Sequence, residues 1–130
     1  MIVLDASALV EWLRQTPTGA RVEARISAEP MDLHAPHVID VEVVQVLRRH
    51  VRARLMTDSR AEEALEDLAD LVLVRHPHDG FVWRIWELRR NLTAYDAVYV
   101  ALAEALDAPL VTCDGKVASA PGHHARVEVI

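Results

Sequence analysis

Cysteine is nearly absent from this chain of 130 residues, which contains only Cys113. A single cysteine excludes an internal disulfide and is typical of proteins from a reducing compartment. Because Cys113 lies in an apolar segment, we expect an inert thiol in the core. No apolar run approaches the ~18–20 residues that a membrane-spanning helix needs. No basic segment precedes an apolar one at the start of the sequence, so we expect no signal peptide and a cytoplasmic location.

The sequence also lacks an excess of positive charge, since its formal net charge is −6. This sign excludes proteins that coat nucleic acids by bulk electrostatic attraction. The basic residues nevertheless gather in two places, namely Arg48, Arg49, Arg52 and Arg54, and Arg84, Arg89 and Arg90. Such a basic rim beside an acidic cleft could hold one nucleic-acid strand. The alternative is that these arginines belong to solvated helix faces.

Hydrophobic residues make up 52% of the chain, which is enough to fill one core without disulfides or a structural metal. The length fits one domain, residues 1–130, and no repeat, low-complexity tract or linker interrupts it. Short apolar runs predict strands at residues 2–4, 31–35, 71–74, 109–113 and 127–130.

Helical patterns alternate with these strands, at residues 6–15, 20–27, 38–55, from 59 onward, around 81–88 and from 93 onward. Parallel strands need such crossover connections, so the order predicts an α/β fold. We expect a small central parallel sheet of four to five strands, flanked by helices on both faces. Residues 115–124 are expected to form polar turns.

Two local patterns give more detail. Along the helix at 38–55, the residues expected to face the core are Val38, Val41, Val44, Val46 and Leu47. Ser59 and Glu62 have capping-box spacing, which predicts that the next helix begins at Ser59.

The stretch from Thr93 to Asp114 predicts a helix, a tight turn and a buried strand, with an acid at each end. Asp96 lies in the first helical turn, and Asp114 follows the strand directly. Because the helix packs back along the strand, its start should lie near the end of the strand. The two carboxylates should therefore meet at one edge of the sheet.

Two further acids have settings that lead to the same edge. Asp5 follows the first strand, and Glu42 lies one turn into the helix after the second. Ligands of open α/β sheets bind beyond the carboxyl ends of the strands. Carboxylates gathered there cannot all stay ionised without a cation, and Mg²⁺ and Mn²⁺ prefer oxygen ligands. The sequence therefore predicts a Mg²⁺ or Mn²⁺ site suited to phosphodiester hydrolysis.

Each acid also has a purely structural interpretation. Asp96 follows Thr93 with capping spacing, Asp5 can cap the next helix, and Glu42 can be an exposed helical residue. Asp114-Gly115 is a common turn pair. These interpretations explain each acid singly but leave their shared location unexplained. No histidine or cysteine pair has zinc-ligand spacing, and we expect His123-His124 to be solvated.

Four segments, LDAS at the start, Glu42 followed by VLRR, LTAYDAVYVALAEAL and LVTCD, resemble PIN-domain ribonucleases, and most of all the VapC toxins of prokaryotic toxin–antitoxin pairs. The resemblance covers nearly the whole chain in order. It implies a Mg²⁺- or Mn²⁺-dependent endoribonuclease, inhibition by a cognate VapB-type antitoxin, and homodimerisation. It further implies a set of catalytic and metal-binding acids, Asp5, Glu42, Asp96 and Asp114, with Ser7 and Thr112 as nearby hydroxyls.

Two residues depart from the pattern of the family. Asp107 ends the helix where related sequences often have glycine, and Asp tolerates the left-handed conformation better than most residues. Asp40 adds an acid near Glu42 whose helical position points away from it.

The candidates for holding phosphates that flank the cleaved bond are Arg48, Arg89, Arg90 and Lys116.

Three other functions are alternatives, and the first two fit the residues poorly. A receiver-type phosphoacceptor domain would use Lys116, but needs an acidic acceptor where Arg75-His76 follows the third strand. A haloacid-dehalogenase-like phosphatase needs an acid at the position of Ser7. A catalytically silent interaction module would use the acids to bind the basic arm of an antitoxin.

Overall fold

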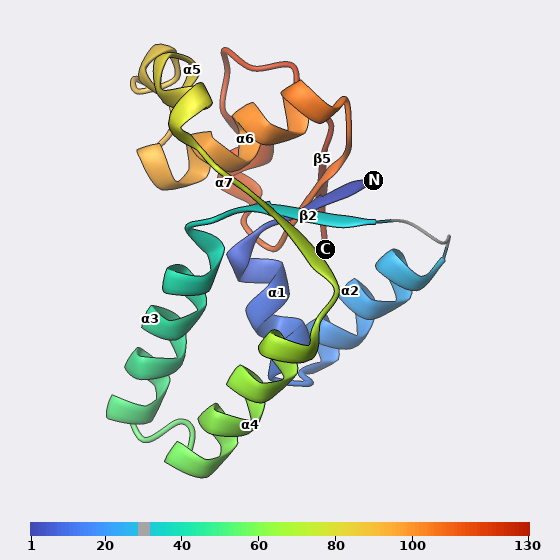
Figure 1. The fold of residues 1–130 in the computed structure, drawn as a ribbon, viewed down its shortest axis with the longest axis vertical. Coiled ribbons are helices and arrows are strands. Elements are labelled where there is room, and N and C mark those ends of the chain that lie inside the picture. Colours follow the sequence, from blue (N-terminus) through green and yellow to red (C-terminus); the bar gives the residue numbers. More distant parts are fainter. Residues whose placement is uncertain (29–31) are drawn as a thin grey trace.

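A computed structural model describes residues 1–28 and 32–130, and its centre is a parallel sheet with the strand order β3-β2-β1-β4-β5 (Figure 1). The strands are β1 (Ile2–Leu4), β2 (Leu33–Pro36), β3 (Leu73–His76), β4 (Leu110–Thr112) and β5 (Val127–Val129). The expected α/β fold is confirmed. Receiver-type domains place their first strand between the second and third, so this strand order disfavours that alternative.

Helices cover both faces of the sheet. They are α1 (Ala6–Leu13), α2 (Pro17–Ser27), α3 (Ile39–Arg52), α4 (Asp58–Asp70), α5 (Val82–Glu87), α6 (Ala94–Leu106) and α7 (Gly115–Ser119), with a 3₁₀ turn, η1 (Asp79–Phe81). Figure 1 shows α1 to α4 on one side of β2, and α5 and α6 on the other. No helix in residues 1–28 and 32–130 is long and apolar enough to cross a membrane.

Helix α6 is the most deeply buried helix, with every residue from Ala97 to Ala103 buried. Thr93 begins it, because its hydroxyl accepts a hydrogen bond from the Asp96 amide. Asp107 ends it in the left-handed conformation expected from the sequence, with φ 47° and ψ 42°. A helix held on all sides in this way fixes the position of Asp96 at its start.

The sequence placed the buried face of α3 correctly only in part, because Leu47 is buried as expected but Val41 and Val44 are not. Val41 is 69% exposed and Val44 is 48% exposed, whereas Ile39, Val43 and Leu47 are buried. Val38 and Val46 pack only at the margin of the core. Both sets of residues have helical spacing, and the side of the sheet on which α3 lies decides which set is covered.

Several boundaries also differ from the prediction. Helix α2 begins at Pro17 and is capped by Thr16, since proline suits the first helical position. The cap of α4 is Thr57, whose hydroxyl accepts from the Arg60 amide, so the capping box at Ser59 is wrong. Residues 115–119, expected as turns, form α7.

Two strand predictions shift along the chain. The strand expected at 31–35 begins at Leu33, and its expected first residue, Met31, lies outside the described residues. The third strand occupies Leu73–His76 because it pairs in parallel with β2 over this range. Cys113 follows β4 and is free and only partly buried; burial raises the pKa of its thiol.

Candidate active site

Asp5 lies at the carboxyl end of β1 and is only 8% exposed. Its carboxylate accepts hydrogen bonds from the hydroxyl of Thr112 in β4 and from the hydroxyl of Ser7, the latter at 2.9 Å. It also accepts from the Ser7 amide, so Asp5 does cap α1. Burial raises the pKa of Asp5, the hydroxyl bonds oppose this rise, and the charge of Asp96 adds to it, with a net upward result.

Glu42 lies in the first turn of α3 and is partly buried. The hydroxyl of Tyr99 in α6 donates to its Oε1 at 2.9 Å. Burial, followed by the charges of Asp5 and Asp96, raises the pKa of Glu42 to about 7, although the Tyr99 bond opposes the rise. The exposed-helix interpretation of Glu42 is therefore wrong.

Tyr99 is a residue of the site that sequence reasoning missed. It is 2% exposed, and burial and the neighbouring Glu42 raise the pKa of its hydroxyl. The available signal was its position three residues after Asp96, which places both side chains on one face of α6.

Asp96 is both a capping residue and a member of the acidic group. The Thr93 hydroxyl donates to its Oδ2 at 3.0 Å and accepts from its amide at 3.2 Å. Thr93 thus caps the helix, and its hydroxyl also holds the Asp96 carboxylate in place. Its charge nevertheless raises the pKa of Asp5 and of Glu42, so the structural interpretation is correct but incomplete.

Asp114 follows β4 and caps α7, because its Oδ1 accepts from the Lys116 amide at 2.9 Å. Its own amide donates to the Thr112 hydroxyl at 2.9 Å, and that hydroxyl donates to Asp5. The structure therefore connects Asp114 to Asp5 through Thr112. Asp5, Glu42 and Asp96 are instead linked by electrostatic repulsion.

The partners of these four acids differ from those of three acids that arginines hold. Asp40, Glu104 and Glu128 form hydrogen-bonded ion pairs with arginines at 2.6 to 2.8 Å. Within the described part of the chain, none of the four site acids forms an ion pair, and hydroxyl or amide groups are their partners. Several other acids, among them Glu62 and Asp70, also lack an ion pair in the described chain, so what distinguishes Asp5 and Glu42 is their burial and the raised pKa of each carboxyl.

The chemistry of this donor set fits a hard divalent cation, which takes carboxylate oxygens and retains water. A bound cation would lower the raised pKa values of Asp5 and Glu42 and would offset the repulsion between the carboxylates. Among residues 1–28 and 32–130, no three His, Cys, Asp or Glu side chains are grouped closely enough to hold an ion as they stand. Asp40 is excluded from the group because both its oxygens bind Arg75, at 2.7 and 2.8 Å.

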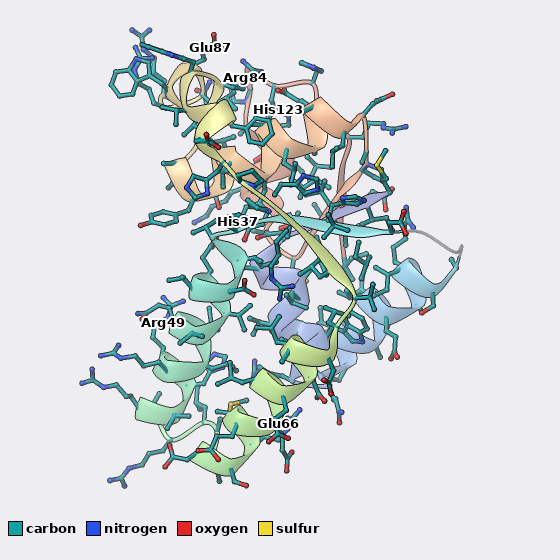
Figure 2. The ribbon with its side chains drawn as sticks, viewed as in Figure 1. His37, Arg49, Glu66, Arg84, Glu87 and His123 are labelled. Atoms are coloured by element: carbon teal, nitrogen blue, oxygen red, sulfur yellow. The ribbon has the colours of Figure 1, made fainter. Side chains whose placement is uncertain are left out.

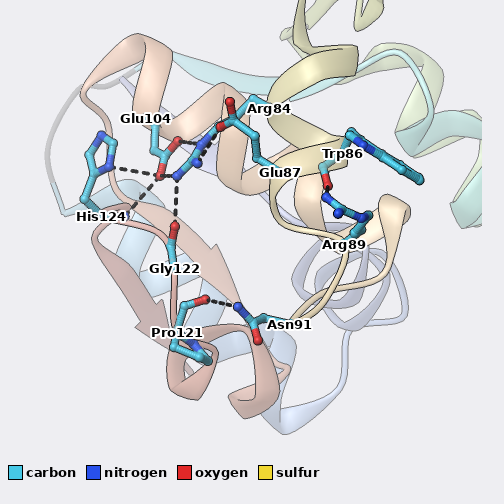
Figure 3. Close-up of polar contacts among 9 residues, drawn as sticks. All are labelled: Arg84, Trp86, Glu87, Arg89, Asn91, Glu104, Pro121, Gly122 and His124. Atoms are coloured by element: carbon cyan, nitrogen blue, oxygen red, sulfur yellow. Dashed lines mark hydrogen bonds and ion pairs between the residues drawn. The ribbon is translucent and has the colours of Figure 1, made fainter.

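The predicted phosphate-binding side chains are all exposed, in α3, after α5 and in α7, namely Arg48, Arg89, Arg90 and Lys116. Figure 2 shows their neighbour Arg49 pointing away from the sheet. Arg84 is instead held by Glu104, Glu87 and the carbonyl of Gly122, as Figure 3 shows.

The adjacent histidines near this network differ from each other. His124 is exposed and its Nδ1 lies 3.2 Å from Glu104. His123 is partly buried with Nε2 at 3.0 Å from the Val117 carbonyl, so its expected solvation is wrong.

Comparison with known proteins identifies the family. The PIN domain family matches residues 2–122. Ribonuclease VapC12 of Mycobacterium tuberculosis is 42% identical over 130 residues, covering 100% of this chain and 99% of the relative. Ribonuclease VapC1 of the same species is 40% identical over 129 residues, covering 98% and 96%.

Two solved structures share the fold. Mycobacterium tuberculosis VapC20, described as a Sarcin-Ricin loop cleaving toxin, has a TM-score of 0.71 at 14% identity, covering 95% of this chain and 97% of that one. FitAcB from Neisseria gonorrhoeae has a TM-score of 0.61 at 17% identity, covering 98% and 96%. At these identities the likeness concerns the fold alone. Taken with the VapC relatives, it leads to one assignment: this chain belongs to the PIN-domain family, as an endoribonuclease toxin of the VapC type.

Proposed function

We propose that Asp5, Glu42, Asp96 and Asp114 form the metal-dependent site at which this ribonuclease hydrolyses RNA. The observation that carries the proposal is that Asp5 and Glu42 are buried near Asp96 with no ion-pair partner in the described chain: burial first, and then the charges of Asp5 and Asp96, raise the pKa of Glu42 to about 7. Burying acids close together lowers the stability of the fold. Acids with such shifted pKa values are found mainly at functional sites, where the chemistry needs them.

We assign each residue a role according to its position in the site. Asp5, Asp96 and Asp114 would hold the ion, with Ser7 and Thr112 fixing the Asp5 carboxylate. We propose that the ion is Mg²⁺, with Mn²⁺ as an alternative. When bound, it would polarise the phosphate of the RNA and lower the pKa of a bound water molecule.

Glu42 completes this set or orients the attacking water. Tyr99 binds its Oε1, and among the described residues Oε2 has no hydrogen-bond donor of its own, so it can accept from a water molecule. With a pKa of about 7, Glu42 can also hold a proton at neutral pH.

The partners follow from the site and the family. Arg48, Arg89, Arg90 and Lys116 are exposed and would hold phosphates of the RNA beside the cleaved bond, which offsets the net charge of −6. The membership of the VapC type supports a VapB-type antitoxin as the cognate partner and a homodimer as the assembly.

The test is Asp96→Asn, which removes the charge and keeps the side-chain shape. We expect cleavage of single-stranded RNA to collapse and the Mg²⁺-induced rise in melting temperature to shrink. Without metal, stability should hold or increase, because like charges are relieved. Asp40→Asn is the matched control, since Asp40 lies in α3 but pairs with Arg75, and it should cleave normally. If Asp96→Asn lowers stability while cleavage survives, Asp96 is only a cap and the proposed site is wrong.

A further inference from the structure

Large aromatic side chains are exposed on α5 and at the start of α6. Trp83 is 79% exposed, Trp86 is 58% exposed and Tyr95 is 63% exposed. Soluble proteins rarely leave adjacent aromatic side chains in water, and such patches mark binding surfaces. The function assigned to the acids does not yet use this surface.

The exposed aromatics line a groove made of two adjoining cavities, which share Ile85 and Ala94. One cavity, of about 500 Å³, includes Trp83, Trp86 and Arg89. The other, of about 190 Å³, includes Tyr95 and Val38. We call these two cavities the aromatic groove.

The aromatic groove leads toward the acidic site. Val38 is the residue before α3, the helix that carries Glu42 in its first turn. Tyr95 directly precedes Asp96 in α6. A ligand lying along the groove would thus end beside the helix starts that present two of the site acids.

A fixed cation lies on this surface. The Arg89 guanidinium lies over the Trp86 ring, 4.3 Å from its centroid, and Nη1 donates to the Trp86 carbonyl at 2.9 Å. Figure 3 shows this pair. In residues 1–28 and 32–130, neither Arg89 nor the exposed Arg90 after it forms an ion pair. Their charges are available to phosphate.

The helix that carries the tryptophans is held firmly. Arg84 in α5 donates to both carboxylate oxygens of Glu104 in α6, at 2.8 and 2.9 Å. Figure 3 shows that this network also reaches Glu87 and the Gly122 carbonyl. A surface fixed in advance loses less entropy when it binds a flexible strand.

We propose that the aromatic groove binds a single-stranded segment of the RNA substrate, with bases stacked on Trp83 and Trp86 and a phosphate on Arg89. The proposal rests on the proposed function for the identity of the substrate. A chain of net charge −6 repels RNA as a whole, so binding must come from local cations and from stacking, which does not depend on charge. An aromatic face beside an unpaired guanidinium provides both.

The main experiment measures binding of a labelled single-stranded oligoribonucleotide in EDTA, where cleavage is prevented. Stacking on one aromatic side chain changes affinity by about 5- to 100-fold. We expect Trp83→Ala and Trp86→Ala each to raise Kd by such a factor, while Trp86→Phe stays within about 3-fold of wild type because it keeps a ring. Leu55→Ala, at another exposed apolar residue, is the matched control and should leave Kd unchanged.

Two further measurements separate stacking from general destabilisation. In steady-state cleavage, Trp86→Ala should raise KM and leave kcat within about 2-fold, since the groove holds the strand and not the reacting atoms. With Trp12→Phe as background, the remaining tryptophans are Trp83 and Trp86, and RNA should quench their fluorescence. Abasic sites scanned along the RNA should weaken binding to wild type at one or two positions, a test that needs no tryptophan variant.

The proposal is overturned if Trp83→Ala and Trp86→Ala bind RNA like wild type and no abasic position changes Kd by more than about 3-fold. If these variants also turn a dimer into a monomer by light scattering, the groove is an interface between copies of the chain. The acidic site is judged separately. If Trp83→Ala and Trp86→Ala raise Kd as expected but Asp96→Asn stays fully active, the RNA-binding groove is supported and the proposed metal site is wrong. If Asp96→Asn is inactive but both tryptophan variants bind RNA like wild type, the metal site is supported and the RNA-binding groove is wrong.

Discussion

Replacing Glu42 by glutamine should remove a pH-dependent loss of stability from the metal-free protein. The pKa of Glu42 rises from 4.5 to about 7 in the folded state because of burial and of the charges of Asp5 and Asp96. The folded state therefore favours the protonated carboxyl. Its contribution to stability is fully present below pH 4.5 and is lost as the pH rises through about 7.

The size of the effect follows from this pKa interval. A rise from 4.5 to about 7 corresponds to at most about 3.4 kcal/mol. Glu42 is only partly buried, so solvent screening should leave roughly 1–2 kcal/mol. For a chain of this length this is about 4–8 °C in melting temperature. The glutamine keeps an Oε1 that can accept from Tyr99, so the packing of the site is retained.

The assay is unfolding by urea and by heat in EDTA, at a series of pH values from 4.5 to 8. Glu42→Gln and wild type should agree at the acid end, and the variant should be more stable at pH 8. Adding Mg²⁺ should stabilise wild type more than the variant. Tyr99→Phe is a useful companion, since loss of a bond that lowers the pKa of Glu42 should steepen the wild-type pH dependence. An unchanged difference between Glu42→Gln and wild type across this pH range would refute the reasoning.

Two further predictions concern stability alone. Arg84→Ala leaves the Glu104 side chain, 8% exposed, without its main partner and should cost about 2–4 kcal/mol in urea unfolding. Arg75→Ala breaks a more exposed pair and should cost no more than about 1 kcal/mol, and equal losses would contradict this use of burial. Gly19→Ala would place a Cβ 2.0 Å from the carbonyl oxygen of residue 11, so we expect a loss of about 2 kcal/mol or more, measured by melting temperature. At Gly80, a new Cβ would meet nothing within 4 Å, so Gly80→Ala should change stability by less than about 0.5 kcal/mol. A similar loss of stability at both glycines would argue against close packing of α2 on α1 at Gly19.

The order of elements and the settings of the acids could be predicted from the sequence because they depend on neighbouring residues. Alternating apolar runs and helical patterns are enough to predict a parallel sheet. Asp5 and Asp114 follow strands, and Asp96 opens a helix capped by Thr93, so local pattern places each at a strand end or helix start. The left-handed Asp107 is likewise a local property.

Other features depend on which surfaces meet. The rotation of α3 was mispredicted in part, because Val41 and Val44 have helical spacing as good as that of the buried Ile39 and Val43. The side of the helix that the sheet covers decides between them, and no local pattern records it.

The pairs that tune the site are also products of the tertiary structure. Tyr99 donates a hydrogen bond to Glu42 although the two residues lie 57 positions apart along the chain. Arg84 was expected on a basic rim, but its charge is bound by Glu104 when α5 packs on α6. By itself the sequence determined which acids stand at strand ends and helix starts, because backbone geometry over a few residues dictates that. The fold alone decided how strongly those acids repel one another and which arginines remain free, because burial and charge pairing arise only when distant segments come into contact.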